Sequence, residues 1–314
     1  MLLELPEAGA ATIEQPKKRE RNASALRGTR LLVAEDNPIN QQLALEFLQR
    51  AGATVIIAEN GREAVAAATG AAAAGNAHDA ILMDIHMPVL DGLEAVRILR
   101  ESGTRTPIIA VSADALGSHR AAALEAGCDA YVTKPIDFDV LLAELTRLLP
   151  QRPVELRRRA TDHPPEPSGA PTTEAPAAAP AEPSLQRLPG IDIGAAIRGH
   201  NGNIKLMLKL MGDFGRYYGD AGPRIRRMVT QGEFEDAERL AHNLHGVAGS
   251  FGAQRLQGAS KALEIALAGD RDEAAGNILG LVQRFETALQ EVLEAADALA
   301  SERVALRASD FEDR

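Results

Sequence analysis

The sequence predicts two domains of different fold class: an α/β domain with a parallel sheet at residues 29–149, and an all-α four-helix bundle at residues 190–300. Three observations lead to this prediction. Short apolar runs alternate with helical patterns in the first segment, only helical periods occur in the second, and a Pro-rich linker, residues 150–189, lies between them. We expect residues 1–28 to form a flexible N-terminal segment and residues 301–314 to form a C-terminal tail.

Five apolar or β-branched runs predict the strands of the first domain. They are RLLVAE (30–35), TVIIA (54–58), DAILMD (79–84), TPIIAVSA (106–113) and DAYVTKP (129–135). Helical patterns separate them, as in residues 38–52, where Ile39, Leu43 and Phe47 share one face behind a proline suited to the first turn. Strands that alternate with helices predict a parallel sheet covered on both faces, and such sheets bind ligands at the carboxyl ends of their strands.

The Pro-rich stretch differs in composition from both neighbours. Residues 150–189 hold ten of the seventeen prolines, mixed with Ala, Glu, Ser and Thr, and such a segment has too little apolar surface to fold. We expect a linker with an r.m.s. span of roughly 35 Å or more. After it, short polar breaks favour antiparallel neighbours among four predicted helices, at residues 203–218, 233–248, 254–268 and 273–298.

The composition narrows the classes of partner and compartment. The chain of 314 residues has a formal net charge of -10, which is unfavourable for binding a nucleic-acid backbone. We interpret the basic cluster KKRER at 17–21 as part of a solvated linker. The single cysteine, Cys128, excludes an internal disulfide, and no apolar run approaches the roughly 20 residues of a membrane span. We therefore expect a cytoplasmic protein without direct membrane contact.

Charged and hydroxyl side chains stand at the ends of four predicted strands. In chain order they are Glu35, Asp36, Asp84, Ser112 and Lys134. The carboxyl ends of parallel strands meet at one rim, where three carboxylates repel one another unless a cation is present. Oxygen ligands with spare positions suit Mg²⁺, which accepts phosphate oxygens, and an aspartate can be the nucleophilic acceptor of a phosphoryl group. The alternative, that these residues only cap the next helix, fits Asn37 best.

Two histidines three residues apart, His242 and His245, lie in the helical stretch AERLAHNLHGVAGSFGA at 237–253. On a helical wheel, His242 lies roughly 130° from the centre of the apolar arc, and His245 lies on its shoulder at roughly 80°. Gly246 and Gly249 share the outward side with His242, although a glycine inside a helix costs roughly 1 kcal/mol. Small residues there let another protein surface approach. A shared zinc ion is the alternative, but no nearby pattern of Cys, His or paired acids supplies its other ligands.

Residues 30–149 resemble the response-regulator receiver domain over its full length. The residues that carry the resemblance are VAEDNPIN, ILMDIHMPVLDG, VSADA and DAYVTKPID, in this order. The resemblance implies a flavodoxin-like fold with five parallel strands in the order 2-1-3-4-5. It also implies the following roles: Asp84 as phosphoacceptor, Glu35, Asp36 and Asp84 as Mg²⁺ ligands, Lys134 as a phosphoryl contact, Ser112 as the switch hydroxyl and Tyr131 as the switch aromatic. His86 could tune the lifetime of the acyl phosphate, or be an exposed loop residue.

Residues 190–268 resemble a histidine phosphotransfer domain, a four-helix bundle whose signature helix reads Ala-His-x-Leu-Lys-Gly-x-Ala-Gly. This chain has AHNLHGVAG. The resemblance implies that His242 is the phosphorylated residue. There is one departure, because His245 stands where the family has a lysine. The positive charge that holds the phosphoryl oxygens therefore depends on pH.

Together, these patterns predict a two-component phosphorelay protein that moves a phosphoryl group between Asp84 and His242. An upstream histidine kinase would load Asp84, and a downstream response-regulator receiver would dock at His242 and take the group, although the chemistry allows the reverse flow. The sequence has no nucleotide-binding glycine boxes. We therefore expect no ATP-dependent kinase activity from this chain alone.

The sequence also allows three alternatives to this function. The chain could be the C-terminal fragment of a hybrid sensor histidine kinase, because LLELP at 2–6 weakly resembles the last strand of such a kinase's ATP-binding domain. Incubation with labelled ATP and no partner would discriminate the two. A docking module without turnover is disfavoured by the intact surroundings of Asp84 and His242. A DNA-binding regulator is disfavoured because a helical module replaces any helix-turn-helix output domain.

Overall fold

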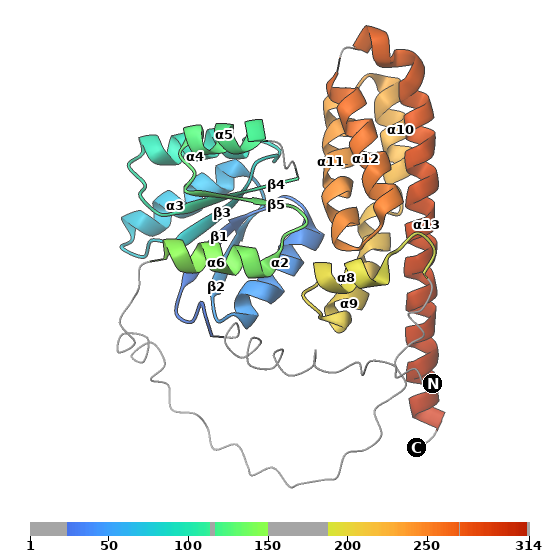
Figure 1. Cartoon of the computed structure of the whole chain (residues 1–314), viewed down its shortest axis with the longest axis horizontal. Helices are drawn as coiled ribbons and strands as arrows, with labels where there is room; N and C mark the ends of the chain where they lie inside the picture. Colours follow the sequence, from blue (N-terminus) through green and yellow to red (C-terminus); the bar gives the residue numbers. More distant parts are fainter. Residues whose placement is uncertain (1–23, 114–116, 150–187, 270, 313–314) are drawn as a thin grey trace, which may run out of the picture.

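The computed structural model describes residues 24–113, 117–149, 188–269 and 271–312 (Figure 1). The predicted linker and N-terminal segment, with their KKRER and LLELP motifs, therefore lie almost wholly outside the described residues. The α/β domain contains, in order, β1 (Arg30–Ala34), α2 (Pro38–Arg50), β2 (Thr54–Ala58), α3 (Gly61–Ala73), β3 (Ala80–Asp84), α4 (Gly92–Glu101), β4 (Ile108–Ser112), α5 (Gly117–Ala126), β5 (Ala130–Thr133) and α6 (Phe138–Leu148). The helical domain contains α8 (Ile193–Gly199), α9 (Ile204–Tyr218), α10 (Ala221–Gln231), α11 (Phe234–Ser250), α12 (Gln254–Ala268) and α13 (Arg271–Glu312).

The sheet has the order β2-β1-β3-β4-β5, and all its pairings are parallel, which confirms the predicted fold. All five residues of β3 and of β4 are buried, because helices cover both faces of the sheet. Helices α2 and α6 cover one face, where the rings of Phe47 and Phe138 stack with centroids 3.9 Å apart. Helices α3, α4 and α5 cover the other face (Figure 1).

The helical domain is a bundle in which α11 packs against α10 and α12, and α13 packs against α9, α10 and α12. The sequence-based prediction missed two helices, the short α8 and α10; Gly222 and Pro223 of α10 resemble a break. Pro223 lies in the first turn of α10, where a helix needs no N–H donor. Helix α13 also runs to Glu312, through most of the segment expected to be a tail.

The two domains contact each other through the carboxyl ends of the strands and the face of α11 (Figure 1). Helix α2 lies beside α9, and the Asn37 side-chain amide donates a 2.7 Å hydrogen bond to the hydroxyl oxygen of Tyr218. Both residues are buried in this arrangement. The docking therefore places α11 directly over the rim at which the sequence predicts the ligands of the α/β domain.

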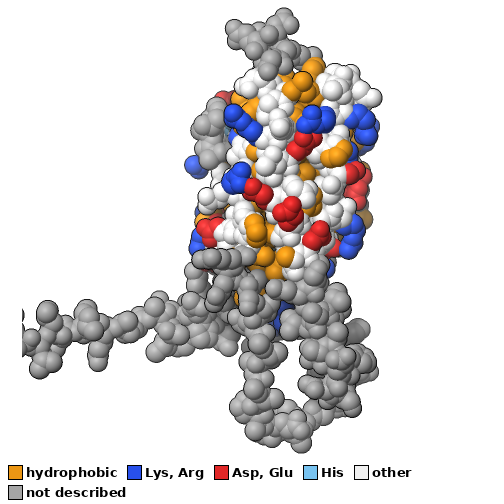
Figure 2. Space-filling model, turned by 90° about the vertical axis from the view of Figure 1, so that its right-hand side faces the viewer, with side chains coloured by type: hydrophobic (Ala, Val, Ile, Leu, Met, Phe, Trp, Pro, Cys, Tyr) orange, Lys and Arg blue, Asp and Glu red, His pale blue; other side chains and the backbone are white. Residues whose placement is uncertain are grey.

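The opposite side of the bundle has a mixed surface. Figure 2 shows that Lys and Arg side chains alternate there with Asp and Glu over the described part of that face, with small apolar areas between them. Among the described residues, no helix combines the length and the apolar character that crossing a bilayer requires.

Candidate functional site

Three carboxylates meet at the carboxyl ends of β1 and β3. Glu35 and Asp36 follow β1, and Asp84 is the last residue of β3; one oxygen of each lies within 4.8 Å of the others. Asp84 is only 1% exposed, and its Oδ1 accepts a 3.2 Å hydrogen bond from the backbone N–H of His86. The structure thus brings together the three predicted Mg²⁺ ligands.

Lys134, which follows β5, binds two of these carboxylates. Its Nζ lies 2.6 Å from Asp84 Oδ2 and 2.8 Å from Glu35 Oε2. Ser112 ends the neighbouring strand β4 and is fully buried; its backbone oxygen accepts a 2.7 Å hydrogen bond from the Lys134 N–H. The predicted lysine and hydroxyl therefore stand on the same rim as the carboxylates.

The charges of the rim are strongly coupled. Burial raises the pKa of Glu35 to about 7, although Lys134 opposes this shift. Burial would lower the pKa of Lys134, but Asp84 and Glu35 outweigh it and raise that pKa, so the lysine stays charged. Burial also raises the pKa of Asp36, whose Oδ1 is buried and has no hydrogen-bond partner among the described residues. A buried carboxylate oxygen without a hydrogen-bond partner, next to two further carboxylates, is suited to bind a hard cation such as Mg²⁺.

The loop after β3 holds Asp84 in a tight backbone turn. Asp91 caps α4 by accepting hydrogen bonds from the N–H groups of Leu93 and Glu94. A Cβ on Gly92 would lie 1.9 Å from the backbone oxygen of Asp84, so only glycine fits there.

His242 reaches the same rim from the other domain. Its Nδ1 lies 3.1 Å from Glu264 Oε1 on α12, while its Nε2 is buried and has no partner among the described residues. The side chain is only 5% exposed, and its ring centroid lies 4.5 Å from that of His86. The prediction that His242 points away from the bundle core agrees with this position, but the residue is not exposed because the α/β domain covers it.

Glu264 connects His242 to a lysine. Lys261 Nζ lies 3.1 Å from Glu264 Oε1, the same oxygen that contacts His242. Burial alone would raise the pKa of Glu264, but the hydrogen bond to His242 and the charge of Lys261 lower it overall. Glu264 is therefore a carboxylate that accepts a hydrogen bond from the Nδ1–H group, which leaves the lone pair of His242 on Nε2.

The other two histidines differ from His242 in their surroundings. His245 Nδ1 lies 3.0 Å from the backbone oxygen of Gln257 on α12, so its ring is bonded to the neighbouring helix of the bundle. His86 is half-buried rather than exposed. Its burial is the main cause that lowers its pKa, and the charge of the nearby His242 lowers it further.

The glycines of α11 do lie at a close approach, as the sequence predicts. A Cβ on Gly246 would lie 3.6 Å from Lys134 Cδ. One on Gly249 would lie 2.7 Å from Gln257 Nε2 of α12 and 3.5 Å from Pro135 Cδ. Between them and the carboxylates, the Asn243 side chain donates a 3.0 Å hydrogen bond to Asp36 Oδ2. The surface that approaches His242 is thus the α/β domain of the same chain.

Comparison with known proteins gives the family. The model of the response regulator receiver domain matches residues 31–146. Two-component response regulator ORR41 of Oryza sativa is 42% identical over 114 residues, which are 36% of this chain and 87% of that protein. The chain belongs to the response-regulator receiver family. A model of the Hpt domain matches residues 212–303, so the receiver domain is followed by an Hpt domain.

The chain spans only a small part of several longer relatives. Sensory/regulatory protein RpfC of Xanthomonas campestris is 30% identical over 240 residues, which are 75% of this chain and 30% of that protein. Hybrid signal transduction histidine kinase M of Dictyostelium discoideum is 36% identical over 124 residues, and the match spans 5% of its length. The solved receiver domain of sensor histidine kinase PA1611 from Pseudomonas aeruginosa is 40% identical, covers 38% of this chain and 97% of its own, and has a TM-score of 0.35. The receiver and Hpt domains together support a phosphorelay protein.

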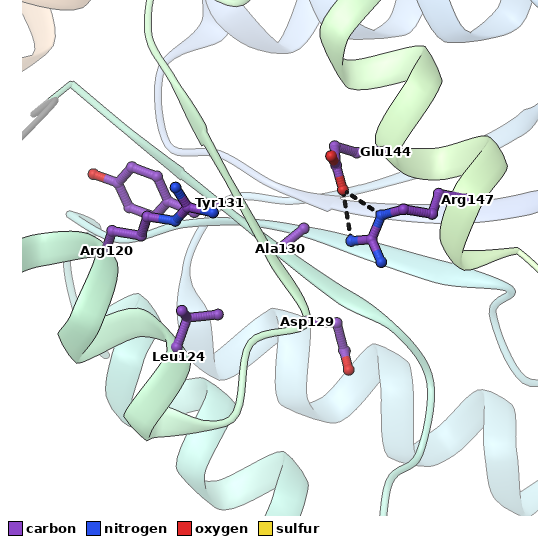
Figure 3. A pocket seen from close by; sticks show the side chains of 7 residues that line it. All are labelled: Arg120, Leu124, Asp129, Ala130, Tyr131, Glu144 and Arg147. Carbon is purple, nitrogen blue, oxygen red and sulfur yellow. Dashed lines mark hydrogen bonds and ion pairs between the residues drawn. The ribbon is translucent and has the colours of Figure 1, made fainter. Parts of the chain in front are cut away.

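Tyr131 of the receiver domain lies at a separate surface pocket of about 280 Å³ (Figure 3). Figure 3 shows its ring beside the side chain of Arg120, with Leu124 on the same side and the Glu144–Arg147 ion pair opposite. None of the three carboxylates of the rim lines this pocket. The structure therefore places the predicted switch aromatic at a pocket that does not include the carboxylate rim.

Four residues near the site were not predicted from the sequence. Tyr218 and Asn243 are bonded to the receiver domain, and Lys261 and Glu264 lie beside His242 within the Hpt domain. Glu264 did leave a signal, because it lies on the face of α12 that also buries Leu256, Leu263 and Leu267, and a buried acid requires a partner. Asn243 and Tyr218 left none, since their bonds reach a second domain.

Proposed function

We propose that Asp84 and His242 exchange a phosphoryl group within this chain, and that the chain thereby connects a histidine kinase to a response regulator in a cytoplasmic phosphorelay. The observation that carries this proposal is the ring of His242. Its Nε2 is buried without a partner among the described residues, on a helix that lies over the rim of Asp84. A buried nucleophile with its other nitrogen oriented by a carboxylate is suited to attack.

The phosphoryl transfer requires no additional proton donor. The Nε2 lone pair attacks the phosphorus of the Asp84 acyl phosphate, an N–P bond forms, and the P–O bond to Asp84 breaks. The electron pair of that bond returns to the Asp84 carboxylate. The Nδ1 proton stays on the ring, where Glu264 stabilises the positive charge that develops. The reverse transfer uses the same atoms in the opposite order.

The remaining residues have electrostatic roles in this proposal. Glu35, Asp36 and Asp84 would hold Mg²⁺, which when bound neutralises charge on the phosphoryl oxygens. Lys134 and Ser112 contact the phosphoryl group, and both already stand on the rim of Asp84. His245, which stands where the family has a lysine, would contact the phosphoryl oxygens, and Tyr131 would report the phosphorylated state at its own surface.

Labelling with a small acyl phosphate in the presence of Mg²⁺ tests the proposal. We expect label first on Asp84 and then on His242, distinguished by the base lability of acyl phosphates and the acid lability of phosphohistidine. Asp84→Asn should lose both labels, and His242→Gln should keep only the label on Asp84. EDTA should suppress labelling, because the three carboxylates then lack a cation.

His245→Gln is the matched control, since it changes a histidine of the same helix that is bonded within the bundle. It should still acquire label on His242, at a reduced level. Label on His245 in the wild type, or full labelling of His242 in Asp84→Asn, would contradict the proposed route.

A further inference from the structure

Asn243, the residue after His242, reaches across the domain contact to the carboxylate rim. Its side-chain amide donates a 3.0 Å hydrogen bond to Oδ2 of Asp36, 207 residues away in the chain. Asn243 is half-buried, and its backbone oxygen lies 3.5 Å from the side-chain nitrogen of Asn37. An Hpt residue is thus bonded directly to one of the three receiver carboxylates.

The two oxygens of Asp36 have different surroundings. Oδ2 is bonded to Asn243, whereas Oδ1 is buried and has no hydrogen-bond partner among the described residues. A buried acceptor without a partner destabilises the structure, and a cation between Glu35, Asp36 and Asp84 would remove this cost. The hydrogen bond to Oδ2 fixes the carboxylate, so that Oδ1 stays available to the cation.

We infer that Asn243 is a positioning residue for the metal of the receiver domain, and that Mg²⁺ binding and domain docking strengthen each other. The inference rests on the proposed function only in taking Glu35, Asp36 and Asp84 as the Mg²⁺ ligands. Residues that orient a metal ligand typically change metal affinity by 10- to 100-fold. Because linkage is reciprocal, Mg²⁺ must tighten docking by the same factor by which docking tightens Mg²⁺ binding.

A calorimetric titration of the full chain with Mg²⁺ tests the first half of this linkage. We expect Asn243→Ala to bind Mg²⁺ about 10-fold more weakly than the wild type. Asn76→Ala is the matched control, because Asn76 is an exposed asparagine of the receiver domain that lies in the loop after α3, and it should bind Mg²⁺ as the wild type does. Circular dichroism melting checks that each variant is folded.

Hydrogen exchange tests the reciprocal half and does not depend on the calorimetric signal. Mg²⁺ should slow amide exchange in α11 around His242 in the wild type and in Asn76→Ala, and should have little effect in Asn243→Ala. Equal or tighter Mg²⁺ binding by Asn243→Ala, or faster exchange of α11 upon Mg²⁺ addition, would overturn the inference. A wild type that binds no Mg²⁺ at all would overturn the proposed metal site together with the inference.

Discussion

At the scale of single residues, the two ring nitrogens of His242 have different partners. Glu264 accepts from Nδ1 and leaves the lone pair on Nε2. Glu264→Ala removes this acceptor. We expect the transfer from Asp84 to slow by ~10- to 100-fold, since a hydrogen bond to a charged group contributes about 1.5–3 kcal/mol and each 1.4 kcal/mol is a factor of ten. Rapid-quench kinetics of the transfer from Asp84 measure this effect.

Glu264→Gln is the matched control for Glu264→Ala, because its amide oxygen can still accept from Nδ1 and should preserve most of the rate. The ¹⁵N chemical shifts of His242 report the tautomer. The Nδ1–H form should dominate in the wild type and in Glu264→Gln, and should be mixed with the other form in Glu264→Ala. Equal transfer rates in all three proteins would show that Glu264 does not orient the ring.

Single residues could be predicted from the sequence where their own strand or helix determines their position. Asp84 ends β3 and Lys134 follows β5, and parallel strands deliver their ends to one rim. Periodicity alone predicted that His242 lies on the outward side of its helix, and in the structure this side chain lies against His86 of the receiver domain and is 5% exposed. Glu264 and Lys261 could not be placed beside it, because their proximity depends on how α11 and α12 pair. A lysine on α12 thus lies next to the partner of His242, while His245 is bonded to a backbone oxygen.

At the scale of elements, Gly246 makes α11 a poorer helix but a better docking surface. Gly246→Leu should raise the melting temperature of the chain, because glycine is roughly 1 kcal/mol less favourable than a good helix former. The same change should abolish transfer between Asp84 and His242, because a side chain longer than a methyl group would occupy the space of Lys134. The expected result is therefore a higher melting temperature together with a loss of phosphotransfer.

Gly258→Leu is the control for Gly246→Leu. Gly258 is an exposed glycine of α12, and a Cβ built there meets no atom within 4 Å. Gly258→Leu should raise the melting temperature and leave the transfer between Asp84 and His242 unchanged. If Gly246→Leu transfers at the wild-type rate, the domains do not meet at α11 during the reaction.

The elements themselves could largely be predicted from the sequence. All five strands were predicted, because each is a short apolar run between turn residues. Helix α10 was missed because tertiary packing overrides its breakers: Gly222 faces α13, and a Cβ there would lie 3.1 Å from Glu286 Cγ. A helix that requires a small residue for packing has the same sequence signal as a turn.

At the scale of the whole molecule, the docking of the domains could not be predicted from the sequence. Asn37 was expected only to cap α2, and its Oδ1 does accept the N–H of Ile39 at 3.0 Å. Its Nδ2 in addition donates to Tyr218, 181 residues away. A single side chain therefore has both a local role that propensity indicates and a long-range role that only the fold creates.

This docking also has a consequence for partners. The receiver domain of the chain lies against His242, which in the proposed relay a downstream receiver would have to reach. Asn37→Ser keeps an oxygen to cap α2 but is too short to reach Tyr218. The lost hydrogen bond should weaken docking within the chain by about 0.5–1.5 kcal/mol, or ~2- to 10-fold. His242 should then become more accessible to a second protein.

The measurement uses a donor and an acceptor that are both full chains. The donor has Asp84→Asn, with or without Asn37→Ser, and is phosphorylated on His242 by phosphoramidate. The acceptor has His242→Gln, so it can receive the group only on its own Asp84 and keeps an intact Asn37 for docking to the donor. The donor with Asn37→Ser should transfer ~2- to 10-fold faster, since its own receiver competes less well for the same face of α11. A donor with Asn76→Ser should match the unmodified donor, and an equal or slower transfer from Asn37→Ser would mean that the receiver of the chain does not shield His242.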